Sequence, residues 1–289
     1  MEKSWWIVYT QRRANVNSAG VGWVHGTDLG VASSMNGGHS WLYRGTLNLP
    51  ALERGRNTFW APEILFHNDL RHMYVSYITG VPAAWTGERH ILHYTSENLW
   101  DWKFESRLPL PGDRAIDACV HPLPEGGWRL WYKDESDASL THAADSPDLY
   151  HWRPICAQTT ACGQEGPNVF RLEGQYFLIA DMWDGMAVYR SGDLAHRNRQ
   201  PGNLLAEGGT RPGDNCRRLH ADILSLPDRA YIFYFVHPGT GDYGYSVEGE
   251  IQPYAQRRSV LQGARLTVWD GRLDCDRNAP FDFHLPAQP

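Results

Sequence analysis

Lysine is scarce in this chain, and long apolar runs are missing. Only three of the 27 basic residues are lysine, and with 33 acidic residues the 289-residue chain carries a net charge of −6. Proteins that follow a nucleic-acid backbone need a basic surface, so this balance argues against nucleic acid as a partner. No apolar stretch approaches the ~20 residues of a membrane-spanning helix, so we expect no membrane partner either.

Paired cysteines are missing as well. The five cysteines, Cys119, Cys156, Cys162, Cys216 and Cys275, contain no Cys-x-x-Cys pair. This scatter argues against a zinc knuckle and against a disulfide framework. The first ten residues, MEKSWWIVYT, show neither the apolar core nor the cleavage site of a secretory signal. Taken as it stands, the sequence predicts a cytoplasmic protein, and it contains no indication of oligomeric state.

Helical periodicity is nearly absent. Short runs rich in β-branched and aromatic residues recur instead, separated by Gly, Pro, Asn and Asp, and this pattern is typical of an all-β chain. The chain also has 13 Trp and 14 Tyr, which favour β-structure and a site that stacks flat ligands or sugars. Its length allows one large domain or two small ones.

Five of these runs resemble one another and recur at intervals of 68, 55, 48 and 55 residues. They are WWIVYT from Trp5, MYVSYI from Met73, WRLWYK from Trp128, YFLIAD from Tyr176 and YIFYFV from Tyr231. Four of the runs are preceded by another short strand and a turn. We call this preceding segment the leader of its run. Similar tails follow three runs, at 38–45, 99–106 and 149–155, with a degenerate one at 192–200. A unit of about 50 to 60 residues with three or four strands is the size of one propeller blade.

We therefore predict an all-β, five-bladed β-propeller that forms a single domain over residues 1–289. A ten-stranded sandwich is the alternative, but it would not explain the regular order of leader, run and tail. In a propeller the first strand of each blade lines the central channel. The leaders place polar or aromatic residues at comparable points of successive blades: Trp60, Glu63, Asp117, Glu165, His220 and Asp222. Polar groups that recur near an axis are costly to bury without a role, so they are candidate site residues.

The leaders resemble motifs of glycoside hydrolase family 43. In order along the chain they resemble its Trp-Ala-Pro-Glu blade (FWAPEILFHNDLRHMYVSY), its Ile-Asp-Pro blade (AIDACVHPLPEGGWRLWY), its Glu-Gly-Pro blade (EGPNVFRLEGQYFLI) and its last blade (RRLHADILSLPDRAYIFYFVHPG). The matches extend from about residue 5 to 240. The resemblance implies a five-bladed propeller that cleaves glycosidic bonds with inversion, mostly of arabinofuranosides and xylosides.

The resemblance also implies roles for individual residues. Glu165 matches the general acid, and Asp117 matches the carboxylate that orients and tunes it. His220 matches the histidine that commonly holds a water-shelled cation, Ca²⁺ or Na⁺, in the channel. Ala118 follows Asp117 where the family usually has proline, a difference that affects the backbone and not the chemistry. Inversion further requires a carboxylate base across the sugar, at ~6.5–9.5 Å from the acid.

That base, an Asp early in blade one of the family, has no counterpart here, because the run from Trp5 has the pattern of a second strand. Three explanations compete. The chain start is set too late and a first strand with an Asp lies upstream, which we expect. Alternatively, Asp28 in the long loop after the run replaces the base, although a simple Thr-Asp turn also explains it. Lastly, the protein binds sugar without cleaving it. If the chain start is set too late, the first-strand position is open here or filled by the run FDFHLP at 281–286.

Further candidates are substrate contacts. Trp60 and Trp85 could stack on sugar rings, and Arg12 could bind a carboxylated sugar through two of its guanidinium nitrogens. Glu63 and Asp222 would contact the substrate from the channel. The sequence thus predicts an inverting, exo-acting glycoside hydrolase for small plant-type oligosaccharides. The alternative is a carbohydrate-binding propeller with little or no catalysis.

Overall fold

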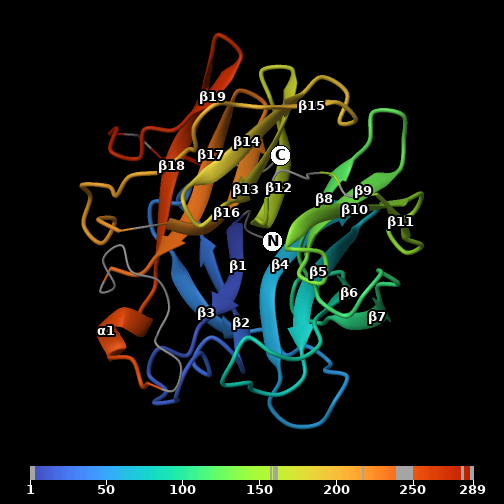
Figure 1. Cartoon of the computed structure of the whole chain (residues 1–289), viewed down its shortest axis with the longest axis vertical. Helices are drawn as coiled ribbons and strands as arrows, with labels where there is room; N and C mark the ends of the chain where they lie inside the picture. Colours follow the sequence, from blue (N-terminus) through green and yellow to red (C-terminus); the bar gives the residue numbers. More distant parts are fainter. Residues whose placement is uncertain are drawn as a thin grey trace.

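The chain folds into five antiparallel β-sheets around a common axis, as Figure 1 shows. This computed structural model describes residues 4–156, 158, 162–216, 218–238, 250–280 and 283–286. From channel to rim, the first three sheets are β1 (Trp5–Gln11), β2 (Asp28–Ser34) and β3 (Leu42–Thr46); β4 (Thr58–His67), β5 (Leu70–Ile78), β6 (His90–Ser96) and β7 (Lys103–Arg107); and β8 (Ala115–Pro122), β9 (Trp128–Asp134), β10 (Leu140–Ser146) and β11 (Arg153–Ile155). The other two are β12 (Glu165–Leu172), β13 (Gln175–Asp181), β14 (Met186–Ser191) and β15 (Arg197–Arg199); and β16 (Arg218–Leu226), β17 (Arg229–Val236), β18 (Val260–Trp269) and β19 (Arg272–Asp274). The predicted five-bladed β-propeller is confirmed.

Two-residue turns explain why leader and run pair as hairpins. Asn68 and Asp69 join β4 to β5, and Glu173 and Gly174 join β12 to β13. Their φ angles are 49°, 61°, 49° and 81°, so both residues of each turn are left-handed, as a type I′ hairpin turn requires. Asn, Asp and Gly adopt this conformation at low cost. The run that follows each turn is the second strand of its sheet, and a neighbour on either side buries it.

The shared tails form one recurring turn. In blade three, the Ser146 hydroxyl accepts the N–H of Leu149 at 2.9 Å, and Asp148 Oδ1 accepts the N–H of Tyr150 at 2.9 Å. The Trp152 ring N–H donates to the Leu149 carbonyl at 3.1 Å. Blade two repeats this arrangement from Ser96 onward, and blade four repeats its serine and aspartate contacts from Ser191. The tail therefore ends the third strand and starts the outermost one.

The four channel-lining strands are all interrupted at the same level by a β-bulge. The register shifts lie between Trp60 and Glu63, Ile116 and Cys119, Glu165 and Asn168, and Leu219 and Ala221. At each bulge one residue has a positive φ: Ala61, Asp117, Gly166 and His220. Bulges re-aim side chains next to functional sites. These four positions are equivalent in the fold, and they place the polar residues described below.

Among the described residues blade one has three strands, and β1 occupies the second-strand position. The bulge N–H of Ala61 donates to Thr10 Oγ1 of β1 at 2.9 Å, just as the bulge N–H of Asp117 donates to Ser76 Oγ of β5 at 2.9 Å. Because β5 is a second strand, Thr10 marks β1 as one too. All residues of β1 are only half-buried, and no described strand pairs with its channel-facing edge. The expectation that blade one begins with its second strand agrees with this geometry.

The C-terminal segment lies at the junction of blades five and one. The N–H of Leu285 donates to the Gly37 carbonyl at 2.8 Å, and the ring N–H of Trp5 donates to the Pro286 carbonyl at 2.9 Å. The Phe283 ring packs against blade five. Residues 281 and 282 of the run considered above lie outside the described residues. The described part, 283–286, caps one end of β1 and does not add a strand beside it.

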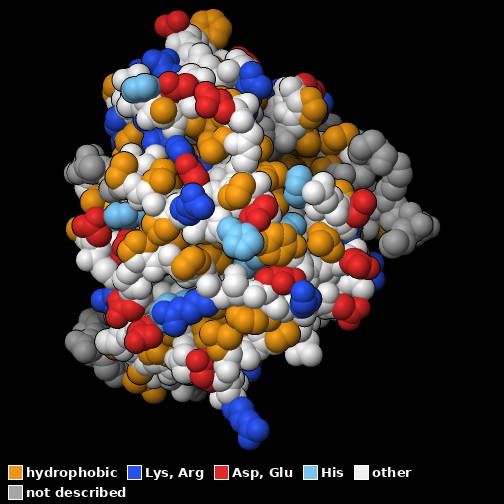
Figure 2. Space-filling view, turned by 90° about the vertical axis from the view of Figure 1, so that its right-hand side faces the viewer, with side chains coloured by type: hydrophobic (Ala, Val, Ile, Leu, Met, Phe, Trp, Pro, Cys, Tyr) orange, Lys and Arg blue, Asp and Glu red, His pale blue; other side chains and the backbone are white. Residues whose placement is uncertain are grey.

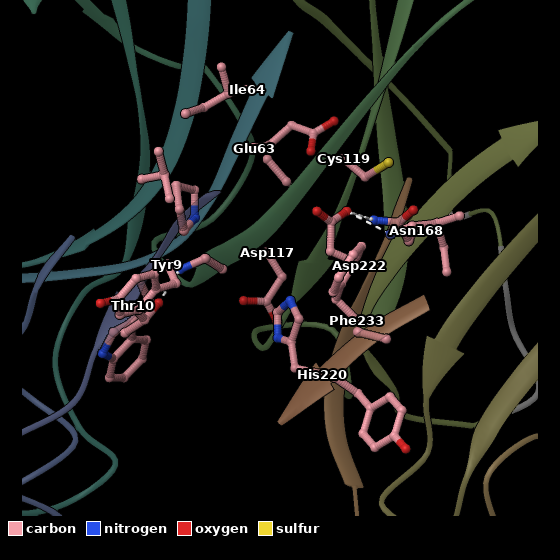
Figure 3. A pocket seen from close by; sticks show the side chains of 18 of the residues that line it. Tyr9, Thr10, Glu63, Ile64, Asp117, Cys119, Asn168, His220, Asp222 and Phe233 are labelled. Atoms are coloured by element: carbon pink, nitrogen blue, oxygen red, sulfur yellow. Dashed lines mark hydrogen bonds and ion pairs between the residues drawn. The ribbon is translucent and has the colours of Figure 1, made fainter. Parts of the chain in front are cut away.

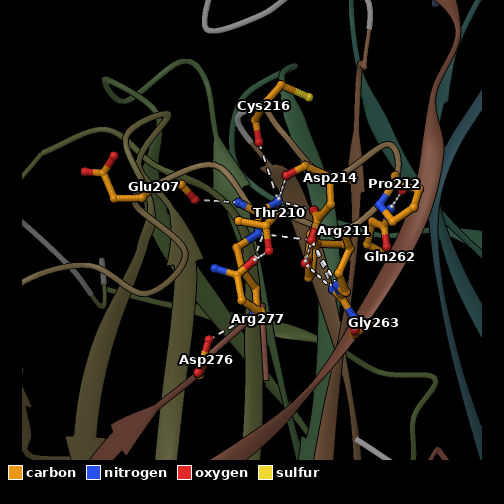
Figure 4. Close-up of polar contacts among 12 residues, drawn as sticks. Glu207, Thr210, Arg211, Pro212, Asp214, Cys216, Gln262, Gly263, Asp276 and Arg277 are labelled. Atoms are coloured by element: carbon orange, nitrogen blue, oxygen red, sulfur yellow. Dashed lines mark hydrogen bonds and ion pairs between the residues drawn. The ribbon is translucent and has the colours of Figure 1, made fainter. Parts of the chain in front are cut away.

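A buried ion network fastens blade five (Figure 4). The fully buried carboxylate of Asp214 contacts Arg277 and accepts hydrogen bonds from Arg211 Nη2 at 3.1 Å and from the Tyr234 hydroxyl at 3.0 Å. Arg277 Nη1 also donates to the Glu207 carbonyl at 2.6 Å. This network ties a loop, a strand and the segment after β19 into one unit.

Candidate active site

The channel opens into a cavity of about 1480 Å³, lined by β1 and the four inner strands. The residues proposed from the sequence that line it are Arg12, Trp60, Glu63, Trp85, Asp117, Glu165, His220 and Asp222. Figure 3 shows Asp117 beside His220, and Glu63 near Cys119 and Asp222. The structure therefore brings together nearly all of the predicted site residues, and the exception is Asp28.

Three neighbouring blades meet at Asp117. Asp117 Oδ2 accepts the N–H of Gly166 at 3.2 Å and lies 3.9 Å from Nδ1 of His220. A Cβ added to Gly166, whose φ is +55°, would stand 2.8 Å from the His220 ring, so only glycine fits there. Glu165 directly precedes this glycine and reaches the same cavity with a side chain that is 23% exposed. The predicted convergence of Asp117, Glu165 and His220 is thus observed.

The environment of Asp117 favours its protonated form. Burial raises the pKa of this carboxyl, and the charge of Glu165 acts in the same direction. His220, Lys133 and the N–H of Gly166 oppose the shift but do not outweigh it. A buried carboxyl with a raised pKa beside a second carboxyl is typical of sites that carry out proton transfer.

Lys133 lies against Glu165, and sequence reasoning missed it. Its Nζ is 3.1 Å from Glu165 Oε2 and 3.2 Å from Glu135 Oε1. Burial by itself would lower the pKa of Lys133, but the carboxylates of Glu165, Asp117 and Glu135 raise it above its ordinary value, so the ammonium is charged. The sequence feature that could have pointed to Lys133 is its place as the last residue of the run WRLWYK, because the chain has only three lysines.

The residues two positions after each positive-φ bulge residue form a second polar level in the channel. They are Glu63, Cys119, Asn168 and Asp222. Asn168 Nδ2 donates to Asp222 Oδ1 at 2.8 Å, and Glu63 Oε1 accepts the N–H of Val120 at 2.8 Å. Burial and the nearby Asp222 carboxylate raise the pKa of Glu63 to about 8. At neutral pH Glu63 is therefore mostly protonated and can donate a hydrogen bond.

Aromatic side chains border the cavity. The Trp60 and Trp85 ring centroids are 6.1 Å apart, and the Trp60 N–H donates to the Val24 carbonyl at 2.7 Å. Trp60 is thus held by packing, and Trp85, which also contacts His25, lines the cavity at 45% exposure. Trp183, which the sequence did not single out, lines the same cavity at 41% exposure and lies 5.4 Å from Lys133 Nζ.

Of two further predicted residues, Arg12 lies at the cavity and Asp28 does not. The Arg12 guanidinium lines the cavity but stacks 4.5 Å from the Phe235 ring centroid, and its Nη1 lies 3.2 Å from Nε2 of His237. Asp28 borders a separate, smaller hollow and forms a 2.9 Å salt bridge with Arg56. Since Asp28 opens β2, one strand farther from the axis than β1, the structure does not bring it to Glu165 and Asp117.

The residues around His220 do not form a protein-ligated metal site. Within the part of the chain that the structure describes, no three His, Cys, Asp or Glu side chains are placed to share an ion. The His220 imidazole forms one described ion-pair contact, between its Nδ1 and Asp117 Oδ2 at 3.9 Å, while the Asp181 carboxylate accepts the His220 backbone N–H. A water-shelled Ca²⁺ or Na⁺ that contacts His220 stays a prediction.

No protein-family model matches the sequence, and no curated protein matches it. Solved structures do match the fold. A thermostable family-43 glycoside hydrolase has a TM-score of 0.67 at 18% identity, over 100% of this chain and 92% of its own. A family-43 β-1,3-galactosidase has a TM-score of 0.68 at 12% identity, over 95% and 91%. An exo-1,5-α-L-arabinanase from a bovine ruminal metagenomic library has a TM-score of 0.59 at 16% identity, over 96% and 94%. The chain thus has the five-bladed β-propeller fold of family-43 glycoside hydrolases.

Proposed function

We propose that the protein is an exo-acting, inverting glycoside hydrolase for small plant-type oligosaccharides, with arabinofuranosides or xylosides as the first substrates to test. The observation that carries this proposal is the pair Glu165 and Asp117, presented by neighbouring inner strands in one cavity and linked through the Gly166 N–H. The names of the structural matches, which include an arabinanase and a β-xylosidase, support a carbohydrate substrate.

In the proposed reaction Glu165 protonates the glycosidic oxygen as its bond to the anomeric carbon breaks. Asp117 orients this acid, because its hydrogen bond from the Gly166 N–H holds the backbone next to Glu165. Glu63 and the Asn168–Asp222 pair offer donors and acceptors to sugar hydroxyls. Trp85, which lines the cavity at 45% exposure, stacks on a sugar ring.

Inversion also needs a base that activates water on the opposite face of the sugar. Among the described residues, no carboxylate of blade one lines the cavity, since Asp28 borders another hollow. This observation favours a second candidate function, a propeller that binds carbohydrate in the same cavity and hydrolyses it slowly or not at all.

The test is a panel of nitrophenyl glycosides: α-L-arabinofuranoside, β-D-xyloside, β-D-galactoside and α-L-rhamnoside. Turnover of one of them supports the hydrolase. Glu165→Gln should then lower the rate by at least ~10²-fold for poor leaving groups and by less for good ones, because only poor ones need a proton. Equal loss for both kinds would contradict the acid role. Calorimetric binding of arabino- or xylo-oligosaccharides without turnover would select the second function.

A further inference from the structure

Lys133 places its ammonium between two carboxylates at the wall of the cavity. Its Nζ lies 3.1 Å from Glu165 and 3.2 Å from Glu135, and its side chain is only 6% exposed. In β9, Lys133 pairs with Ile116, the residue before the Asp117 bulge. The lysine therefore reaches Glu165 from the blade that carries Asp117, and the face of Trp183 lies against it.

Glu135 also forms ion pairs with two arginines. Its Oε2 lies 2.9 Å from Arg89 Nη1 and 3.7 Å from Arg114 Nε, and the Arg89 side chain is 1% exposed. The two arginines hold the Glu135 carboxylate in place. Glu135 in turn anchors the Lys133 ammonium within reach of Glu165, so the charge beside the proposed acid is preorganised.

We infer that Lys133 is a positioning residue for the proton transfer, and that Glu135 is its anchor; this inference rests on the proposed function. As the proton passes from the Glu165 carboxyl to the glycosidic oxygen, the bond from that oxygen to the anomeric carbon breaks and Glu165 becomes a carboxylate. The ammonium 3.1 Å away stabilises that developing charge. A fixed charge in a site with little water helps the transition state more than the neutral acid that precedes it.

The inference predicts shifts of opposite sign in the pH dependence of kcat/KM. An ammonium 3.1 Å from a carboxyl interacts more favourably with its ionised form than with its protonated form, so removal of this charge should shift the balance towards the protonated acid. Lys133→Met should move the alkaline limb to higher pH and lower the maximal rate on poor leaving groups by about tenfold or more. Glu135→Gln should move the limb to lower pH, because Lys133 then pairs with Glu165 alone. A merely structural defect would lower the rate without moving the limb.

The experiment compares the wild type with Lys133→Met, Lys133→Arg and Glu135→Gln. Lys103→Met is the matched control, since Lys103 is 75% exposed and pairs with Glu105 outside the cavity. Lys133→Arg should keep the limb close to that of the wild type, because it keeps the charge. We expect kcat to change more than KM. Limbs that coincide in all variants, or that move in the same direction in Lys133→Met and Glu135→Gln, would overturn the inference.

A readout that needs no turnover separates this inference from the proposed function. The pH titration of the Glu165 carboxyl carbon is followed by NMR in the wild type, Lys133→Met and Glu135→Gln, with circular dichroism to verify folding. Midpoints that move up in Lys133→Met and down in Glu135→Gln support the coupling even if no glycoside is hydrolysed, and the proposed function alone then fails. Turnover with unmoved midpoints would overturn the inference and leave the proposed function standing.

Discussion

Asp117 reaches the channel through a left-handed backbone conformation that most residues avoid. Its φ is +61°, a conformation that costs roughly 1–3 kcal/mol for a residue other than glycine. The hydrogen bond from its N–H to Ser76 Oγ and the one its carboxylate accepts from the Gly166 N–H help to offset this cost. The equivalent bulge residues are Ala61, Gly166 and His220. The bulge is therefore a feature of the fold, and the residue type at it decides the chemistry.

Gly166 permits a direct test of this geometry. Gly166→Ala should lower the free energy of unfolding by about 1–3 kcal/mol, because the position has a positive φ and the new Cβ would collide with the His220 ring. Denaturant unfolding measures the change. Gly192→Ala is the control, since a Cβ there meets nothing within 4 Å and its φ is ordinary. Equal stability of the two variants would show that the Gly166 geometry is wrong.

The raised pKa of Glu63 predicts a stability that falls with pH. The unfolded chain releases the Glu63 proton near the ordinary value of 4.5, whereas the folded chain keeps it until about pH 8. Between these values the folded state binds more protons, so the free energy of unfolding decreases with rising pH, by at most about 1.4 kcal/mol per pH unit. Glu63→Gln should flatten this slope between pH 5 and 8 in denaturant titrations. An unchanged slope would mean that Glu63 ionises normally.

At the scale of elements, a side chain of the preceding blade satisfies the N–H that each bulge frees. The Thr10 side chain accepts the bulge N–H of β4, the Ser76 side chain accepts that of β8, and the Asp181 side chain accepts that of β16. For β12 the acceptor is Asp117 itself, on the preceding inner strand. Neighbouring blades are thus joined by hydrogen bonds at the level of the site as well as by apolar packing.

Thr10 allows this link to be removed without a change of shape. Thr10→Val should lower the free energy of unfolding by about 1–2 kcal/mol, because the Ala61 N–H loses its acceptor. Thr10→Ser keeps the hydroxyl and should lose less. Urea unfolding of the three proteins makes the comparison, and a valine variant as stable as the wild type would show that water replaces the threonine.

At the scale of the whole molecule, five sheets of three or four strands make up nearly all of the regular structure among the described residues. Within the described residues no helix is long and apolar enough to cross a bilayer; α1 (Tyr254–Arg257) is one turn. Acidic and basic side chains are interspersed over the face in Figure 2. Blade five is held by the buried carboxylate of Asp214, which Arg277 reaches from beyond the last strand.

The Asp214 network should be one of the costliest parts of the molecule to break. Arg277→Met should lower the free energy of unfolding by about 3–5 kcal/mol, because a fully buried carboxylate then loses one of its two cations. The control is Arg272→Met in β19, where the arginine is exposed and donates one long hydrogen bond, 3.3 Å, to Pro201. Thermal unfolding of both variants checks the prediction, and a loss no greater than that of the control would contradict it.

The sequence by itself determined the number of blades, because each blade is a local unit of strands and turns that repeats along the chain. It also indicated that Asp117, Glu165 and His220 lie close together, since they occupy the same point of successive leaders or the point next to it. Only the tertiary structure decided which residues surround them. Lys133 of blade three contacts Glu165 of the neighbouring blade four. Asp28 borders a different hollow, because β2 lies one strand farther from the axis than β1. Contacts between blades depend on how the ring closes and on bulges that shift the register, and neither leaves a periodic pattern in the sequence.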